Sequence, residues 1–374
     1  MHNSLRNYLL PCLAGLLVLS ACSWQIPRIS QFPGPALAEP GPTRATCQTL
    51  QSGQGSPESG PQTNQFRPVE VSNRKYELGL PGQSQAVWSS APTAAGLLSP
   101  IVLNISGSSA IASDTCLLGG VVHGNLDLRQ ARGDQYDAYH SGIEQGNESI
   151  DGFAVSDGVR VDRMFDGYRF VGRGAGAGAG AYLKRFYGSD LRDDCLERDE
   201  FTGDVYLYDS LFEGCYSGIS DRGVPAATGA RTVLDGVLMW IKPTTDRRHS
   251  TSADWCNTGE GCHELETQGA GTFAIWKGEA DASGVVEVRN SWFRLDRRTV
   301  WGIDSMAWPC TAGSSWGTGT TCTYRNVKLL WTGSGPYPGP ALPAGVELVT
   351  GARALRMWNA AADAWRVDHG YRDR

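Results

Sequence analysis

Short apolar runs separated by polar turns occupy the chain from about residue 100 onward. The residues between these runs lack the 3.6-residue apolar period of an amphipathic helix. The clearest runs cover residues 101–105, 120–122, 158–161, 205–208, 231–234, 285–288 and 324–330. This pattern predicts an all-β chain, and it argues against a fold in which strands alternate with helices.

A short cassette recurs after several of these runs, with a small polar residue first and an apolar residue two places later. It begins at Asp166, Ser189, Asp209, Asp235, Asn290 and Asn326. The first four starts lie about 23, 20 and 26 residues apart, which is the length of one coil of a β-solenoid. A β-sandwich would also contain many short strands, but it would not place Asp or Asn at one repeated point. The cassette therefore predicts a parallel β-helix.

Each polar residue that opens the cassette is expected at a turn, where successive coils would stack the side chains into a hydrogen-bonded ladder. We therefore interpret all six as structural residues, although Asp166 and Asp209 have side chains that could also serve catalysis. The apolar residues two places later are expected to stack inside the coil. They include Leu191, Leu211, Val237 and Trp292.

The first 21 residues are typical of an export signal, with Arg6 ahead of an apolar core over residues 9–19. That core is shorter than the roughly 20 apolar residues of a transmembrane helix. Leu19-Ser-Ala-Cys22 resembles the lipobox of bacterial lipoproteins, which implies cleavage before Cys22 and lipidation of its thiol. Ser23 follows, which in that resemblance implies the outer membrane of the cell envelope. The alternative is an ordinary signal peptide with an unrelated cysteine.

Composition divides the rest of the chain into two parts. Residues 22–66 are rich in Pro, Gly, Ser, Gln and Thr, which predicts a flexible tether. Residues 67–374 suffice for one β-helix domain, with polar loop insertions near 243–271 and 302–323. The Ala-rich C-terminal tail is expected to pack on or cap the last coil.

Charge and cysteine content narrow the possible partners. The net charge is −6 and the Lys and Arg residues are scattered, so the chain lacks the basic stripe of a nucleic-acid-binding protein. We expect a monomer.

Once Cys12 and Cys22 are set aside, an even number of cysteines remains, which in an exported chain favours disulfides. They are Cys47, Cys116, Cys195, Cys215, Cys256, Cys262, Cys310 and Cys322.

Two cysteine pairs are close enough in sequence to close one loop each, Cys256 with Cys262 and Cys310 with Cys322. Cys195 and Cys215 lie about one coil apart, which fits either a disulfide or two stacked buried thiols. A zinc site formed by Cys256, Cys262 and His263 is an alternative for the first loop.

The densest group of charged residues covers residues 192–199, Arg-Asp-Asp-Cys-Leu-Glu-Arg-Asp. If Cys195 is aligned with Cys215 of the next coil, Arg192 falls one coil from Arg169 on the outer face. The two guanidinium groups would then be about 4.8 Å apart at the backbone, and they would repel unless an anion lay between them. The pattern predicts either a self-neutralised surface ladder or a binding site for an acidic sugar.

In the second interpretation the carboxylates beside these arginines would hold the sugar with a hard cation. Calcium prefers several carboxylate oxygens, and Asp194 and Glu197 are its expected ligands. Further substrate contacts are expected from Glu197, Asp199, Asp221, Arg222 and His140, and His123 could join them. Four tryptophans offer faces on which a sugar could stack, or else belong to the core. They are Trp240, Trp276, Trp292 and Trp301.

Several segments resemble motifs of bacterial right-handed parallel β-helix proteins of the pectin lyase-like fold group. The segments are residues 119–124 (Gly-Gly-Val-Val-His-Gly), 166–169 (Asp-Gly-Tyr-Arg), 192–199 and 209–222. The resemblance covers roughly residues 116–240, and it implies a right-handed parallel β-helix. In that group, pectate lyases use Arg or Lys near carboxylate-bound calcium, and polygalacturonases use clustered aspartates. Asp193-Asp194-Cys195 is similar to part of the hydrolase pattern, while the chain has no Asn-Thr-Asp, Gly-His-Gly or Arg-Ile-Lys.

Two reactions can be written for an acidic polysaccharide. In β-elimination, Arg192 or Arg169 would act as the base, while cation-bound Asp193, Asp194 and Glu197 neutralise the sugar carboxylate. In hydrolysis, one of Asp193 and Asp194 would be the acid and another carboxylate the base. Adjacent strand residues face opposite sides unless the backbone bends, which favours elimination. The alternative is a non-catalytic envelope protein that binds a glycan or a partner through the same face.

Overall fold

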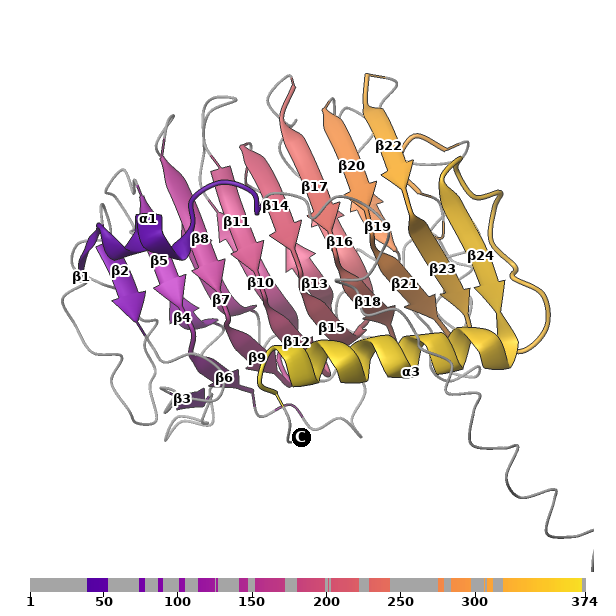
Figure 1. Ribbon diagram of the computed structural model, residues 1–374, viewed down its shortest axis with the longest axis horizontal. Helices are drawn as coiled ribbons and strands as arrows, with labels where there is room; N and C mark the ends of the chain where they lie inside the picture. The colour runs from indigo at the N-terminus through magenta and orange to yellow at the C-terminus, as the bar shows by residue number, and fades with distance from the viewer. Residues whose placement is uncertain are drawn as a thin grey trace, which may run out of the picture.

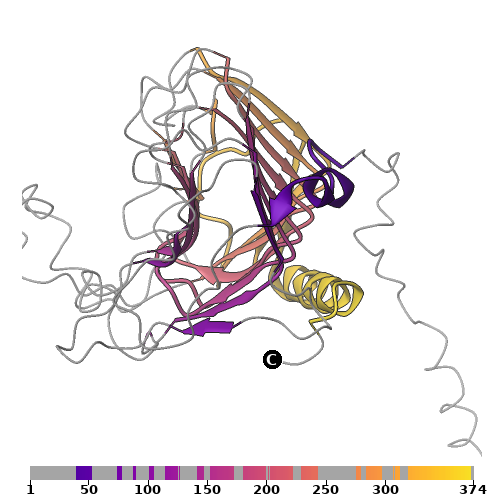
Figure 2. The same cartoon turned by 90° about the vertical axis from the view of Figure 1, so that its left-hand side faces the viewer.

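Every strand pair that the structure describes is parallel, and paired strands follow one another at intervals of one coil (Figure 1). The chain winds repeatedly through three sheets, which form the sides of a parallel β-helix (Figure 2). The predicted all-β parallel β-helix is confirmed. The computed structural model describes residues 39–52, 74–77, 87–89, 101–104, 114–124, 126, 141–146, 152–171, 180–198, 201, 203–221, 229–242, 275–278, 284–296, 306, 308–311 and 319–371.

The three sheets are named A, B and C in the order in which a coil visits them. Sheet A contains β1 (Gln51–Ser52), β2 (Arg74–Glu77), β5 (Thr115–Leu118), β8 (Phe153–Asp157), β11 (Gly180–Lys184), β14 (Asp204–Tyr208), β17 (Arg231–Asp235), β20 (Val285–Arg289) and β22 (Thr321–Arg325). Sheet B contains β3 (Val87–Ser89), β6 (Val121–His123), β9 (Arg160–Asp162), β12 (Tyr187–Ser189), β15 (Leu211–Cys215), β18 (Leu238–Ile241), β21 (Trp292–Leu295), β23 (Val327–Trp331) and β24 (Val346–Thr350). Sheet C contains β4 (Ile101–Asn104), β7 (Ser141–Gly146), β10 (Asp166–Val171), β13 (Asp194–Glu197), β16 (Ser217–Asp221) and β19 (Trp276–Gly278).

The corner between sheets A and B carries a residue with positive φ on each of several successive coils. These residues are Gly158 (72°), Arg185 (48°), Asp209 (44°), Gly236 (70°), Asn290 (47°) and Asn326 (54°). They share one register position, because the residues before them pair directly, as Tyr208 does with Asp235 and Asp235 with Arg289. Asn and Asp tolerate this left-handed conformation better than most side chains, which explains their repeated use.

Side chains at this corner bond to one another. Asn326 Nδ2 donates to Asn290 Oδ1 over 2.9 Å, and Asn290 Nδ2 donates to Asp235 Oδ1 over 3.0 Å. The predicted ladder therefore exists, but two of its expected members lie elsewhere, since Asp166 begins β10 in sheet C and Ser189 ends β12 in sheet B. Neighbouring coils have corners of different length, so a fixed spacing in sequence does not keep one register.

The apolar residues of the cassette do not all face the interior as predicted. Val237 and Leu191 lie in the main core, whereas Leu211 and Trp292 belong to a second cluster on the outer face of sheet B. The reason is their distance from the left-handed corner residue. A residue one place after a left-handed residue faces inward, as Val237 does after Gly236 and Leu191 does after Asp190. A residue two places after it faces outward.

A C-terminal helix, α3 (Gly351–Asp368), covers this outward row and lies across the strands of sheet B (Figure 1). Its buried face consists of Ala354, Trp358, Ala361, Ala362 and Trp365. These side chains pack on Tyr187, Leu211, Leu238, Trp292 and Leu330. A helix of 18 residues is about 27 Å long, close to the about 24 Å of the five spacings between the six strands from β12 to β24. The C-terminal helix therefore packs on many coils and holds them together.

Among the described residues, no helix is both long and apolar enough to span a membrane.

Residues 39–52 are folded onto the β-helix. They contain the short helix α1 (Arg44–Gln48) and strand β1, and Cys47 is disulfide-bonded to Cys116 of β5. The tether predicted over residues 22–66 is therefore wrong for this stretch. The disulfide restricts the chain, which the polar composition of the segment does not reveal.

Two cysteine pairs considered in the sequence are disulfides in the structure, including Cys195 with Cys215, for which two buried thiols were the alternative. Cys195 is bonded to Cys215, and Cys310 is bonded to Cys322. Cys256, Cys262 and His263, and with them the alternative zinc site, lie outside the described residues.

Replacing Asn326 with valine is expected to destabilise the fold by on the order of 1–2 kcal/mol. A β-branched residue is strained at a φ of 54°, and the bond to Asn290 is lost. Asn326→Gly keeps the left-handed conformation and should destabilise less. Thermal unfolding followed by circular dichroism measures both variants. Equal melting temperatures for the two would contradict a conformational role for the corner.

The end of α3 is expected to loosen as the pH rises, because of His369. Its Nε2 lies 3.0 Å from Asp209 Oδ2, and its Nδ1 lies 2.8 Å from the Trp365 carbonyl oxygen. Burial alone would lower the pKa of His369, but the hydrogen bonds and the charge of Asp209 raise it above its ordinary value. Stability from such a group is fully present below its unfolded pKa of about 6.5 and is lost as the pH rises through the folded one.

His369→Gln is therefore expected to lower the melting temperature most at about pH 5 and least at about pH 9. Differential scanning calorimetry at a series of pH values measures the difference from the unsubstituted protein. A difference that stays constant over this range would show that the charge of His369 does not hold α3.

Candidate active site

The turn from sheet B into sheet C forms a second corner of left-handed residues. Arg163, Asp190 and Gly214 have φ values of 54°, 52° and 108°. They follow residues that pair in register, since Ser189 pairs with Asp162 on one side and with Glu213 on the other. The strands of sheet C begin shortly after this corner, so its geometry decides which of their first side chains face outward.

Two consecutive residues face inward near the start of these strands. On β13 they are Cys195 and Leu196, both buried in the main core. The preceding coil has Gly167 in the position of Cys195, and an added Cβ there would lie 2.6 Å from the nearest core side-chain atom. Because the inward pair interrupts the usual alternation, Asp194 and Glu197 on either side of it both lie on the outer face.

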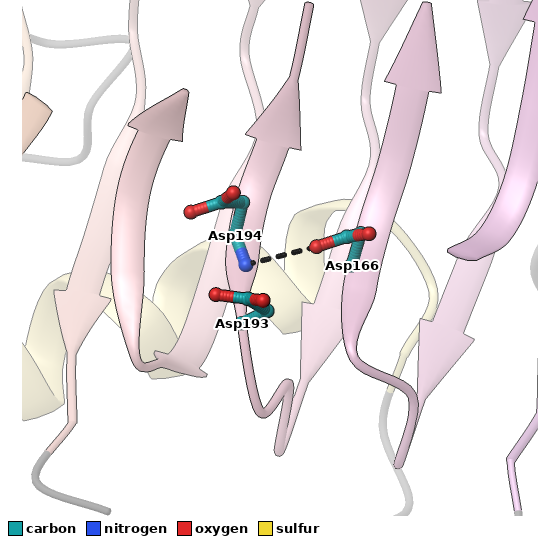
Figure 3. Close-up of side chains that lie close together, drawn as sticks. All are labelled: Asp166, Asp193 and Asp194. Carbon is teal, nitrogen blue, oxygen red and sulfur yellow. Dashed lines mark hydrogen bonds between the residues drawn. The ribbon is translucent and has the colours of Figure 1, made fainter. Parts of the chain in front are cut away.

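Three aspartates from two neighbouring coils meet on this outer face (Figure 3). One carboxylate oxygen from each of Asp166, Asp193 and Asp194 lies within 4.8 Å of the others. Asp193 precedes β13 in the turn, so the backbone bend lets both adjacent aspartates reach the same group. The backbone N–H of Asp194 donates to Asp166 Oδ1 over 3.2 Å. All three side chains are almost completely buried.

Two cationic side chains flank these carboxylates. Lys277 comes from β19, two coils beyond β13, and the register places it in the same row as Glu197. Its Nζ lies 2.6 Å from Asp194 Oδ2 and 3.8 Å from Asp193 Oδ1. Arg169 of β10 is in register with Glu197, and its Nε lies 3.5 Å from Glu197 Oε1. We call Asp166, Asp193, Asp194, Glu197, Arg169 and Lys277 the acidic cluster.

Burial favours the protonated form of two members of the cluster. It raises the pKa of Asp194 to about 8, with Lys277 opposing the shift and the charges of Asp193 and Asp166 adding to it. Burial also raises the pKa of Glu197 far above its ordinary range, and the charge and hydrogen bond of Asp166 add to that shift. Glu197 is therefore neutral at about pH 7 and donates to Asp166.

Protonated and ionised carboxyl groups side by side can carry out acid–base catalysis. A carboxylic acid that stays protonated near neutral pH can donate a proton, and a neighbouring carboxylate can accept one. Asp194 Oδ1 is buried and has no hydrogen-bond partner, so this oxygen is not committed to the fold. Perturbed carboxyl groups of this kind gather at functional sites more often than elsewhere.

The predicted stacking of Arg169 on Arg192 is wrong. Cys195 lies on β13 in sheet C and Cys215 ends β15 in sheet B, so their disulfide crosses a corner and does not define a register. Arg169 is instead beside a glutamate of the next coil, as described above. Arg192 is buried in the turn before β13, where its backbone N–H donates to the Met164 carbonyl.

The remaining predicted substrate contacts do not join the acidic cluster in the part that the structure describes. Asp221 lies at the far end of β16, and its Oδ1 is 3.4 Å from Arg198 Nε. His123 is on sheet B, and its Nδ1 lies 2.7 Å from Asp162 Oδ1. Four further predicted site residues lie outside the described residues. They are Cys22, His140, Asp199 and Arg222.

The tryptophans considered for sugar stacking pack against the protein itself where they are described. Trp276 belongs to the main core, and Trp292 lies under α3. One face of Trp240 is covered by Arg294, whose guanidinium carbon is 3.9 Å from the ring centroid. Trp301 lies outside the described residues.

The contacts within the acidic cluster bear on the predicted calcium site. Calcium takes six to eight oxygen ligands at about 2.3–2.6 Å. Here the Lys277 ammonium already contacts Asp194 and Asp193, and Glu197 is hydrogen-bonded to Asp166. A cation at the predicted ligands Asp194 and Glu197 would have to displace these contacts, whereas one oxygen from each of Asp166, Asp193 and Asp194 already lies within 4.8 Å of the others. Calcium binding at this cluster stays a prediction.

Sequence reasoning missed two members of the cluster. Asp166 was interpreted as a ladder residue, because its cassette looked like those at the first corner. Lys277 was not singled out, since the sequence between β16 and β19 is much longer than one coil and hides the pairing of these two strands. Only the register of β13, β16 and β19 brings Lys277 to Asp194.

Comparison of the chain with models of known protein families, with curated proteins and with solved structures found no significant match.

Glu197→Gln is expected to stabilise the folded protein at about pH 7 by on the order of 1–3 kcal/mol. The buried glutamate must hold a proton in the folded state, because its pKa is raised there, whereas the unfolded chain ionises it above about pH 4. Glutamine needs no proton and keeps a donor toward Asp166. The folded protein binds the extra proton, so its stability falls as the pH rises above about 4.

The gain should therefore shrink toward zero at about pH 4, which urea unfolding at the two pH values measures. Glu347→Gln, at an exposed position on β24, is the control and should change stability little at either pH. A gain from Glu197→Gln that does not depend on pH would contradict a protonated Glu197.

Proposed function

We propose that this protein is a carbohydrate-active enzyme that hydrolyses a glycosidic bond in an acidic polysaccharide. The observation that supports this most is the meeting of buried carboxyl groups with raised pKa values, Asp194 and Glu197, with further carboxylates on the same face. Glycoside hydrolysis requires this division of labour between an acid and a second carboxylate.

Asp194 is proposed as the general acid. Its raised pKa of about 8 keeps it protonated at neutral pH, and its Oδ1 has no other partner. Once Asp194 has given its proton to the leaving oxygen, Lys277 at 2.6 Å stabilises the carboxylate that forms. Asp193 is proposed as the second carboxylate, which activates water or stabilises the positive charge on the sugar ring.

Glu197 and Asp166 are proposed to support these two residues. Their shared proton removes one negative charge from the cluster, so that Asp193 and Asp194 do not face two further anions. Arg169 Nε lies 3.5 Å from Glu197 Oε1, and its positive charge offsets part of the negative charge of the cluster. The pair thereby adjusts the proton affinity of Asp194 without contacting the reacting bond.

β-Elimination is the second candidate, because Arg169 and Lys277 bring basic side chains to the same group of carboxylates. Two observations rank it below hydrolysis. The backbone bend brings Asp193 and Asp194 together, which removes the objection to a pair of adjacent acids. Arg169 and Arg192 do not stack, so the arrangement first expected to hold the sugar carboxylate is missing.

The proposed substrate is acidic because Arg169 and Lys277 are the charged groups that would meet a sugar carboxylate on this face. The proposed location follows from the export signal and the lipobox-like segment at Cys22. A lipid anchor there would hold a monomeric enzyme at the outer membrane of the bacterial envelope, where such polysaccharides are accessible.

The test is a screen of the purified protein against uronate-containing and neutral polysaccharides, with and without a chelator. New reducing ends measure cleavage, and the ultraviolet absorbance of unsaturated sugars distinguishes elimination from hydrolysis. We expect reducing ends without unsaturated products, and no effect of the chelator. We also expect activity to fall as the pH rises above about 8, because Asp194 then loses its proton.

Asp194→Asn and Asp193→Asn should each lower kcat by about 100-fold or more. Asp204→Asn, on sheet A and outside the acidic cluster, is the matched control and should retain activity. Unsaturated products would favour elimination instead. Retention of an acidic polysaccharide on an affinity gel without any shortening would favour the non-catalytic alternative.

A further inference from the structure

We infer that the Cys195–Cys215 disulfide is a positioning element for the acidic cluster: it ties sheet B to sheet C at their corner and so holds Asp193 and Asp194 on the outer face. Its catalytic consequence rests on the proposed function. Its structural consequence, the contact between Asp194 and Lys277, can be measured without any substrate.

The disulfide is placed directly at the bend. Cys195 is the residue after Asp194, and Cys215 ends β15 immediately after Gly214, which has a φ of 108°. The register between β15 and β18 shifts at this point. The bond therefore links the residue that follows Asp194 on β13 to an irregular corner of the next coil.

Backbone hydrogen bonds run on both sides of the disulfide. The N–H of Leu191 donates to the Gly214 carbonyl over 2.7 Å, and the N–H of Ser217 donates to the Asp193 carbonyl over 3.0 Å. Both bonds cross between the coil of Asp194 and the coil of Cys215. The turn that carries Asp193 is thus attached to its neighbour by one covalent bond between two hydrogen bonds.

The coils on either side carry glycine in the row of Cys195, so no side chain of a neighbouring coil packs beside Cys195 in this row. An added Cβ on Gly167 would lie 2.8 Å from the Cys195 carbonyl oxygen, and one on Gly218 would lie 2.1 Å from the Ile275 carbonyl oxygen. At these two positions there is therefore no room for a side chain. Cys195 is the one residue of these three with a side chain there, and that side chain is bonded to Cys215.

Loss of the bond has a specific expected consequence. The alternation of side chains along a strand means that a shift by one residue exchanges the two faces. At this corner such a shift would carry Asp194 toward the main core and away from Lys277, which now lies 2.6 Å away. The inward pair Cys195 and Leu196 is the feature that the disulfide preserves.

The kinetic test compares two disulfide-free variants of the full chain. Cys195→Ala/Cys215→Ala removes the corner disulfide, and Cys310→Ala/Cys322→Ala removes one on the last coils. The two disulfides span 20 and 12 residues, so their removal should destabilise the chain to a similar extent. Below both melting temperatures, we expect kcat to fall at least 10-fold with KM within 2-fold for the first variant. The second should keep kcat within 2-fold.

The substrate-free test is a double-mutant cycle on the free energy of unfolding. Asp194→Asn and Lys277→Met are combined in the unsubstituted chain and in the Cys195→Ala/Cys215→Ala chain. We expect energetic coupling between the two positions with the disulfide present and loss of that coupling without it. Cys195→Val/Cys215→Ala, which restores part of the core volume, serves as the second background if the alanine pair does not fold.

Coupling that persists in the disulfide-free chains would overturn the inference, whatever the kinetics show. Lost coupling together with an unsubstituted protein that cleaves no polysaccharide would overturn only the proposed function, and the positioning role of the disulfide would stand. Lost coupling with an unchanged kcat would overturn the catalytic part of the inference.

Discussion

The structure depends on parallel coils that stack in register, and this stacking depends on what happens at the corners. A strand ladder fixes neighbours only along straight segments, so each turn has to place the next strand at the same height and with the same face inward. A left-handed residue does this at both corners, from Asp209 through Asn290 and Asn326 at one, and at Arg163, Asp190 and Gly214 at the other. The outward rows, the surface under α3 and the acidic cluster all follow from these positions.

The acidic cluster is a local departure from the rules that stabilise the rest of the molecule. Carboxyl groups removed from water destabilise the fold unless they are paired or protonated. Asp194 is protonated near neutral pH and lies beside Lys277, and Glu197 shares a proton with Asp166, so burial is tolerated through bound protons and a neighbouring cation. The large core, the helix α3 and the disulfides stabilise the fold and so offset the destabilisation caused by the buried carboxyl groups. Departures of this kind are expected where function is located.

The architecture could be predicted from the sequence because its signals are local and repeated. Short apolar runs and the recurring polar cassette indicated stacked parallel coils, and Asn290 and Asn326 do form the predicted ladder. The register could not be predicted. Cys195 and Cys215 are one coil apart in sequence yet lie on different sheets, so aligning them placed Arg192 wrongly beside Arg169. Leu211 was assigned to the wrong face because one residue of difference from the corner reverses the side chain. Lys277 was missed because the long sequence between β16 and β19 does not show that these two strands pair.

The same physics explains why a site of this kind arises where it does. On a regular strand, Asp193 and Asp194 would face opposite sides, and only one of them would meet Asp166. The inward pair at Cys195 and Leu196 and the turn before β13 break the alternation at one point, and there carboxyl groups from two coils converge. The chemistry available on this surface therefore comes from the corner that precedes β13, and the regular coils around it hold that corner in place.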